Sequence, residues 1–186
     1  MPLLRCKVAI VGDAEVGKSA LTTMFHKSSK PANYVMTLGV DFCVKTVKIP
    51  NEDSQVELYL FDTSGHDIYA KLRHKYWEGA SWVVVVYDCT DKKSFDNCAN
   101  WIAELNKAVV KGSGKLQGVL VASKSDLKDS AQVTSEQGAQ FAYKNGFGFF
   151  ECSALTGKDV DAPFNFIANA FNLAYQERVK LLTEDL

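Results

Sequence analysis

Near its N-terminus the chain reads Val8-Ala9-Ile10-Val11 and then Gly12-Asp13-Ala14-Glu15-Val16-Gly17-Lys18-Ser19. The apolar run predicts a short buried strand, and the residues after it match the pattern G-x-x-x-x-G-K-[ST]. In this pattern the glycines let the backbone wrap around a phosphate chain and turn successive N–H groups inward. A helix predicted over residues 16–26 adds the partial positive charge of its N-terminus. The segment therefore predicts a strand, a phosphate-binding loop and a helix of an α/β protein.

Two side chains of this loop carry its chemistry. Lys18 is expected to reach the β- and γ-phosphates of a nucleotide, and the Ser19 hydroxyl is expected to ligate Mg²⁺. Glu15 brings a carboxylate close to an anion site, so we expect it to point outward. A chance match is the alternative, but ordinary residue usage gives only about 0.01 such patterns in a chain of this length. The residues expected to contact the nucleotide here are Gly12, Asp13, Ala14, Glu15, Val16, Gly17, Lys18, Ser19 and Ala20.

The rest of the chain alternates apolar strand-like runs with helical stretches. Further strands are predicted over residues 40–49, 56–61, 82–87, 118–122 and 148–152, and helices over 94–110, 135–145 and 160–182. The first two of these strands flank Pro50-Asn51 and predict a hairpin, whereas the others require right-handed helical crossovers. We therefore expect a three-layer α/β fold with a six-stranded, mainly parallel sheet and one antiparallel edge strand. One domain is expected over residues 1–186, with a core of 5–179 and a short C-terminal tail.

Composition narrows the class of protein. The 186 residues contain 21 Lys and Arg against 22 Asp and Glu, a net charge of −1, which predicts no nucleic-acid partner. The five cysteines are scattered and predict neither a disulfide framework nor a zinc site. No apolar run is long enough for a transmembrane segment, no cysteine follows Cys152, and position 2 is proline. We therefore expect a cytoplasmic protein without a lipid anchor or a transmembrane segment.

Two later positions suit the metal and the terminal phosphate of a nucleotide. Phe61-Asp62-Thr63-Ser64-Gly65 ends a predicted strand, so Asp62 can hold Mg²⁺ through water while the Gly65 N–H meets the γ-phosphate. Thr37, at the end of the long loop 27–36, can supply a second hydroxyl ligand. Alone, the first segment would usually mark a turn, and Thr37 could be an ordinary strand threonine. Because a phosphate loop precedes both positions in the chain, we favour a metal site over a turn and an ordinary strand threonine.

A third motif points to a purine base. In Ala122-Ser123-Lys124-Ser125-Asp126, the Asp126 carboxylate can accept hydrogen bonds from the ring N1–H and the exocyclic amine of guanine. The stem of Lys124 can lie over the ring. Adenine lacks this pair of donors and would leave the carboxylate buried and unpaired. In isolation these residues would indicate only a solvated turn. Ser153 and Ala154, after the last strand, can supply a backbone N–H to the guanine carbonyl.

In chain order these motifs resemble the nucleotide site of the Ras-superfamily small GTPases, over Arg5 to about Val179. A resemblance to the Rab branch is carried by the segments 38–42, 76–80, 86–88 and 94–95. A resemblance to the Rab-like GTPases of intraflagellar transport complex B is carried by the segment 161–164 and the apolar residues of the last helix. The resemblance implies a small G-protein fold that binds GTP or GDP with Mg²⁺. It implies metal ligation by Ser19, Thr37 and Asp62, further nucleotide contacts from Tyr34 and Leu155, and GTP hydrolysis that involves Lys18, Gly65 and His66.

The same resemblance implies a setting and partners. It points to the cilium or flagellum and to a multi-subunit transport complex, in which the last helix region docks a small β-sandwich subunit. The aromatic residues of that helix could equally be core packing; they are Phe164, Phe166, Phe171 and Tyr175. Segments 27–36 and 66–75 are expected to order around the γ-phosphate of GTP and to be released after hydrolysis.

Four residues depart from the family pattern, and one of them, Glu15, replaces a glycine that is usual inside the phosphate loop. His66 replaces the glutamine that orients the attacking water, which predicts slow hydrolysis. Ser123 replaces an asparagine, which is expected to weaken the tie between the base loop and the phosphate loop, and Leu155 replaces a lysine. Two alternatives stay open: a structural adaptor whose nucleotide is a folding cofactor, and an unlipidated Rab-type GTPase of vesicle traffic. A phosphate-loop kinase is disfavoured, because a chain with three arginines is poor in residues for a phosphate lid.

Overall fold

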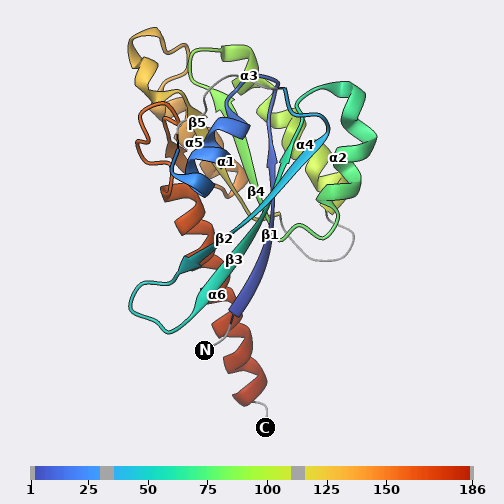
Figure 1. Ribbon diagram of the computed structural model, residues 1–186, viewed down its shortest axis with the longest axis vertical. Helices are drawn as coiled ribbons and strands as arrows, with labels where there is room; N and C mark the ends of the chain where they lie inside the picture. The colour runs from blue at the N-terminus through green and yellow to red at the C-terminus, as the bar shows by residue number, and fades with distance from the viewer. Residues whose placement is uncertain (1–2, 30–35, 110–115, 185–186) are drawn as a thin grey trace.

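A computed structural model describes residues 3–29, 36–109 and 116–184 of the chain. Within these residues a six-stranded sheet has the order β2-β3-β1-β4-β5-β6 (Figure 1). Its strands are β1 (Leu3–Val11), β2 (Val40–Lys48), β3 (Gln55–Thr63), β4 (Trp82–Asp88), β5 (Gly118–Ser123) and β6 (Gly148–Glu151). Only β2 and β3 pair antiparallel among the described strands, and β2 lies at the edge. The predicted sheet is therefore confirmed.

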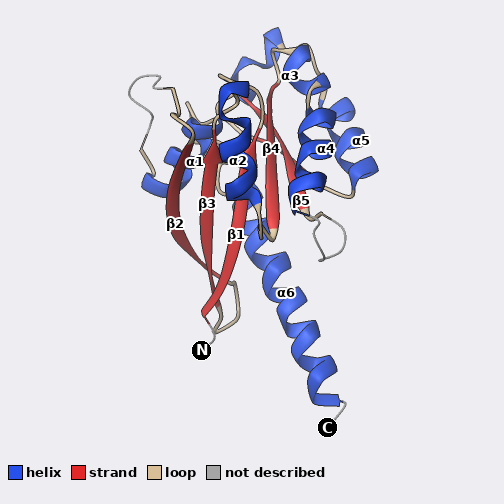
Figure 2. Ribbon diagram, turned by 90° about the vertical axis from the view of Figure 1, so that its right-hand side faces the viewer, coloured by secondary structure: helices blue, strands red, loops and turns tan. Residues whose placement is uncertain are grey.

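Helices cover both faces of the sheet (Figure 2). They are α1 (Lys18–Lys27), α2 (Ala70–Trp77), α3 (Lys92–Asp96), α4 (Cys98–Val109), α5 (Ser135–Asn145) and α6 (Ala162–Glu184), with short 3₁₀ turns η1 (Asp67–Tyr69) and η2 (Ser125–Ser130). Side chains of α1 and α6 pack in one core, and side chains of α2, α4 and α5 pack in the other. The three predicted layers are thus present.

The strand pattern explains how one sheet serves two cores. In β1, Val8 and Ile10 belong to the core under α1 and α6, whereas Ala9 and Val11 belong to the core under α2, α4 and α5. Successive side chains of a strand point to opposite faces, so a strand in the middle of the sheet must be apolar at every position. β4 is apolar from Trp82 to Tyr87, and every residue as far as Asp88 at its end is buried.

The predicted helix over 94–110 is wrong as a single element, because two helices occupy this stretch. The Asp91 carboxylate accepts a hydrogen bond from the Lys93 N–H, which caps α3 and starts it earlier than predicted. The Ser94 hydroxyl donates to the Asp91 carbonyl oxygen and accepts from the Asp88 N–H, so it fastens this short helix to the end of β4. A new helix then begins at Cys98.

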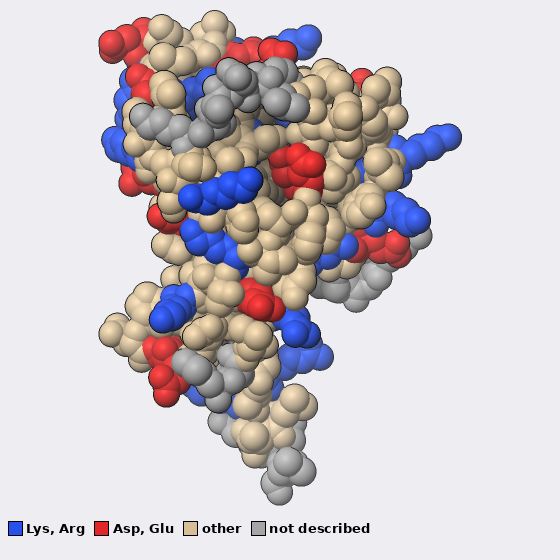
Figure 3. All heavy atoms as spheres, viewed as in Figure 1, with Lys and Arg blue, Asp and Glu red and all other residues tan. Residues whose placement is uncertain are grey.

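Two further helices differ from the sequence prediction. The turn η1 and the helix α2 lie in the segment treated above as a switch, and no apolar periodicity marks them. The last helix begins at Ala162 and continues to Glu184, so its lower half extends past the end of the sheet in both ribbon views (Figures 1 and 2). None of the helices in the described ranges combines the length and apolarity needed to span a membrane. On the face seen in Figure 3, basic and acidic side chains are interspersed.

Candidate functional site

The loop between β1 and α1 is shaped by glycine. Gly12 has a φ of 143°, and a Cβ there would lie 2.1 Å from the Val86 carbonyl oxygen, so no other residue fits. A Cβ at Gly65 would lie 2.3 Å from the Ala14 nitrogen, which places the end of β3 directly against the loop. Glu15 is exposed and has a φ of 65°, in the left-handed region that favours glycine.

Lys18 lies beneath this loop and is 6% exposed. Its Nζ donates to the carbonyl oxygens of Gly12 at 2.9 Å and Asp13 at 2.6 Å. Burial lowers the pKa of Lys18 to about 8, although the nearby carboxylates of Asp62 and Asp13 oppose this shift. The ammonium is therefore held inside the loop, in a position to add positive charge to an anion site.

Three oxygen-bearing side chains from different elements converge beside Lys18. The Ser19 hydroxyl donates to Asp62 Oδ2 at 2.5 Å and lies 2.8 Å from Thr37 Oγ1. Asp62 is 2% exposed, and its second oxygen, Oδ1, has no hydrogen-bond partner among the described residues. Burial raises the pKa of Asp62 to about 6, against the effects of the Ser19 hydrogen bond and Lys18.

These side chains fit a magnesium ion. Mg²⁺ prefers oxygen ligands, and a buried carboxylate oxygen without a partner is stabilised when a cation approaches it. Ser19, Thr37 and Asp62 are the set expected from the sequence. The structure brings them together from the start of α1, the loop before β2 and the end of β3.

The phosphate loop borders a first hollow, here called the phosphate hollow, whose lining includes Lys18, Ser19, Thr37 and Gly65. A second hollow lies on the other side of Gly17 and has a volume of about 270 Å³. The Lys124 ammonium, at its rim, pairs with Asp88 Oδ2 at 2.5 Å. Burial alone would raise the pKa of Asp88, but hydrogen bonds from Lys124 and Thr90 outweigh it and hold this pKa below its ordinary value. Asp88 thereby holds Lys124 in place, and no sequence motif had indicated a role for Asp88.

The base-side loops are tied to one another. The Ser153 hydroxyl donates to Asp126 Oδ1 at 2.5 Å, and the Ser153 N–H donates to the Lys158 carbonyl oxygen at 3.0 Å. Ser153 therefore orients the Asp126 carboxylate, and its own amide is used within the loop. The Ser123 hydroxyl donates to the Val16 carbonyl oxygen. Ser123 thus keeps a direct tie to the backbone of the phosphate loop despite its shorter side chain, and the weaker binding expected from this substitution stays a prediction.

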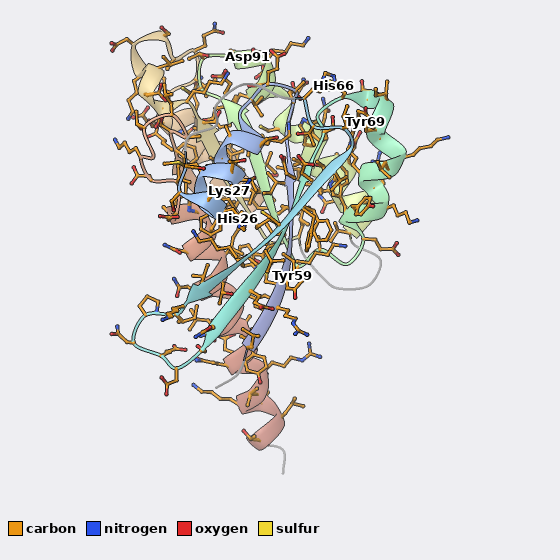
Figure 4. All side chains as sticks on the ribbon, in the orientation of Figure 1. His26, Lys27, Tyr59, His66, Tyr69 and Asp91 are labelled. Carbon is orange, nitrogen blue, oxygen red and sulfur yellow. The ribbon has the colours of Figure 1, made fainter. Side chains whose placement is uncertain are left out.

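His66 follows Gly65 on the segment between β3 and α2. Figure 4 shows it beside Tyr69 at the end of the sheet where the parallel strands finish. Its backbone carbonyl oxygen accepts a hydrogen bond from Arg73 Nη1 at 2.9 Å. No sequence motif pointed to Arg73, because a single arginine in a polar segment carries no pattern.

Most of the predicted residues surround the two hollows. The first is lined by Ala14, Glu15, Gly17, Lys18, Ser19, Ala20, Met36, Thr37, Ser64, Gly65 and His66. The second is lined by Gly17, Ala20, Leu21, Ser123, Lys124, Asp126, Leu127, Cys152, Ala154 and Leu155. Leu21, Leu127 and Cys152 are apolar walls that the motifs did not indicate. Tyr34 lies outside the described residues.

A family model described as the Ras family matches residues 7–173 of the chain. The chain belongs to the Ras family. Ras-family proteins bind GTP or GDP with Mg²⁺ and hydrolyse GTP, so this member is a guanine-nucleotide-binding GTPase. The fold and the two hollows agree with that membership.

Curated relatives of this Ras-family protein include proteins of two kinds. It is 43% identical to intraflagellar transport protein 27 of Chlamydomonas reinhardtii over 180 residues. The aligned region covers 95% of this chain and 88% of that protein. It is 38% identical over 183 residues to the intraflagellar transport protein 27 homolog of Trypanosoma brucei brucei, with 97% of each covered. The Ras-related protein Rab-11B of Dictyostelium discoideum is 35% identical over 181 residues, 97% of this chain and 79% of that protein. The chain is thus a Rab-like member of the family.

Proposed function

We propose that this protein is a Rab-like GTP/GDP switch of intraflagellar transport, which works in the cytoplasm and the cilium or flagellum. The observation that carries the proposal is similarity over nearly the whole chain to intraflagellar transport protein 27 from two distant organisms. The site supports the switch, because Thr37 and Gly65 lie in the two loops that flank the phosphate hollow. A γ-phosphate held by both loops would order them, and its loss would release them.

We assign the nucleotide contacts to the predicted residues. Residues 12–20, with Thr37 and Gly65, surround the phosphates, and Tyr34 is included as a prediction from the family resemblance. Ser19, Thr37 and Asp62 hold Mg²⁺, which supplies charge neutralisation to the phosphates when bound. The base is bound by Ser123, Lys124 and Asp126. The Ser153 N–H already donates to the Lys158 carbonyl oxygen. The N–H groups of Ala154 and Leu155 are therefore the donors assigned to the guanine carbonyl.

In this proposal the chain's own groups perform hydrolysis at the phosphate hollow. Lys18 stabilises the negative charge on the β- and γ-phosphates, and the Gly65 N–H donates to the γ-phosphate. His66 orients the attacking water through a ring nitrogen. An imidazole is shorter than a glutamine side chain and presents one acceptor or one donor at each nitrogen, whereas a glutamine amide can accept from the water and donate to the phosphate at once. We therefore expect unassisted hydrolysis at or below about 10⁻⁴ s⁻¹.

A His66 substitution pair tests this role. His66→Gln should raise the single-turnover hydrolysis rate by about tenfold, and His66→Ala should lower it by about threefold, because glutamine restores water orientation and alanine removes it. The release of phosphate from GTP preloaded on the protein measures both rates. Exposed Lys93, on α3, gives the matched control Lys93→Ala, which should leave the rate unchanged. Equal rates for the wild type and both His66 variants would contradict the assignment.

We further propose that α6 docks a small β-sandwich subunit of the transport complex. Phe164 is buried and stacks on Phe25 with ring centroids 4.0 Å apart, so it belongs to the core. Other apolar side chains of α6 are exposed: Phe166, Leu173, Tyr175, Val179, Leu181 and Leu182. At helical spacing these residues fall on two sides of α6, with Phe166, Leu173 and Leu181 on one side and Tyr175, Val179 and Leu182 on the other. Exposed apolar side chains gathered on one helix are typical of a protein interface.

Partner affinity separates the switch from a structural adaptor. A switch should bind at least one protein of the transport complex about tenfold more tightly when loaded with a non-hydrolysable GTP analogue than with GDP. Calorimetry with the purified complex in the two nucleotide states measures this ratio. Equal affinities in the two states would overturn the switch and favour an adaptor whose nucleotide is only a folding cofactor.

A further inference from the structure

One face of α4, together with Asn97 just before it, contacts two parts of the nucleotide site that lie far apart in the sequence. Asn97, Trp101 and Glu104 follow one another at helical spacing, and the Trp101 N–H donates to the Asn97 carbonyl oxygen at 3.1 Å. Their side chains therefore lie along one stripe. Asn97 and Trp101 of this stripe contact the phosphate loop. Glu104, further along the stripe, contacts α2.

The phosphate loop is fastened to this stripe by Asp13. Asp13 Oδ2 accepts a hydrogen bond from Asn97 Nδ2 at 2.7 Å, and Oδ1 accepts one from Trp101 Nε1 at 2.7 Å. Both carboxylate oxygens are thus bonded, one to Trp101 of α4 and the other to Asn97, the residue just before α4. The backbone carbonyl of the same residue accepts the hydrogen bond from Lys18 Nζ. The side chain of Asp13 therefore fixes a loop residue that in turn holds the phosphate-binding lysine.

The His66 segment is fastened to the same stripe by Arg73. This arginine is 1% exposed, and Nη2 bonds to Glu104 Oε2 at 3.2 Å while Nη1 bonds to the His66 carbonyl oxygen. Its guanidinium carbon lies 4.7 Å from the centroid of the Trp101 ring and 5.7 Å from that of Trp77. A buried arginine with a carboxylate partner and two aromatic neighbours is restricted to one geometry.

Trp101 takes part in both contacts, through its N–H on Asp13 and through its ring on Arg73. We propose that Trp101 is a positioning residue that couples the phosphate loop to the His66 segment, so that nucleotide retention and hydrolysis depend on one side chain. The inference rests on the proposed role of His66 in hydrolysis and deepens it. Without the indole N–H, Asp13 loses one of its two anchors, and the ring that supports Arg73 is free to shift.

A pair of tryptophan substitutions tests this coupling. Trp101→Phe keeps an aromatic ring against Arg73 and removes the N–H. Trp82→Phe is the matched control, because Trp82 is 8% exposed, similar to 7% for Trp101, but lies in the core under α1 and α6. The measurements are the dissociation rate of a fluorescent GDP analogue, the single-turnover GTP hydrolysis rate and the thermal midpoint.

We expect Trp101→Phe to speed GDP release about fivefold and to slow hydrolysis about fivefold, with both rates within twofold of wild type in Trp82→Phe. A third variant, Arg73→Lys, should slow hydrolysis by a similar factor, because an ammonium cannot bond the His66 carbonyl and Glu104 in the same fork geometry. A lower thermal midpoint with both rates unchanged in Trp101→Phe would overturn the proposal, and so would faster GDP release with normal hydrolysis. If the wild-type protein does not hydrolyse GTP, the proposed role of His66 is wrong. Faster GDP release from Trp101→Phe would then still support the anchoring of Asp13 by Trp101.

Discussion

Replacing Asp126 with asparagine is expected to weaken GTP and GDP binding by about a hundredfold and to shift selectivity toward xanthine nucleotides. The carboxylate offers two acceptor oxygens to the N1–H and amine donors of guanine, and each hydrogen bond to a charged group contributes about 1.5 kcal/mol or more. An asparagine amide presents one donor in place of an acceptor. It therefore repels the guanine amine and suits the carbonyl that xanthine carries at that position.

Competition between labelled GDP and unlabelled GTP, XTP and ATP measures this shift. Ser125, next to Asp126, supplies the matched control. Its hydroxyl is buried and has no hydrogen-bond partner among the described residues, so Ser125→Ala should leave every affinity unchanged. A variant Asp126→Asn that keeps full GTP affinity, or that gains ATP rather than XTP binding, would contradict the guanine assignment.

Lys18→Ala should reduce the affinity for both GTP and GDP by at least about a hundredfold. The ammonium is buried among loop carbonyls, so it meets the phosphates with little water to screen it, and its loss removes an interaction of about 3 kcal/mol. The empty variant should remain folded, because the bonds that Lys18 makes in the structure are two hydrogen bonds to backbone carbonyls.

Equilibrium titration with a fluorescent GDP analogue measures the affinity, and circular dichroism checks the fold. Lys93→Ala removes an exposed lysine of the same charge and should leave both unchanged. A folded Lys18→Ala protein with wild-type GDP affinity would remove the phosphate loop from the site. A hundredfold loss of GDP affinity in Lys18→Ala, with no change in Lys93→Ala, would place the nucleotide where the sequence motif predicts it.

The fold was predictable where local patterns coincide with long-range contacts. β4 is apolar at nearly every position because it is buried on both faces, and the pattern therefore identified it. The boundary between α3 and α4 was missed, since it depends on how the Ser94 hydroxyl bonds the end of β4. α2 was missed because its buried residues, Arg73 and Trp77, pack on Trp101 of α4 and do not form an apolar stripe of their own.

The candidate site divides in the same way. Residues 12–19 carry their chemistry in a fixed spacing that predicts a phosphate site by itself, whereas residues 123–126 predict a base site only in a chain that also contains the phosphate loop. Ser123 marks the limit of such reasoning. A substitution that shortens a side chain suggests a lost contact, yet the hydroxyl reaches the Val16 carbonyl oxygen because the loop backbone lies close enough.

Sequence alone was sufficient to predict the phosphate loop and the base-binding loop, because each consists of residues that are neighbours along the chain. Ser19, Thr37 and Asp62 lie far apart in the sequence, so their convergence became visible only in the tertiary structure. Only the tertiary structure could show that Asp13 is bonded to Trp101, 88 positions away, and that Asp88 holds Lys124. These partners meet because helices and loops from distant parts of the chain pack at one end of a parallel sheet. No local pattern records which side chains such packing will bring together.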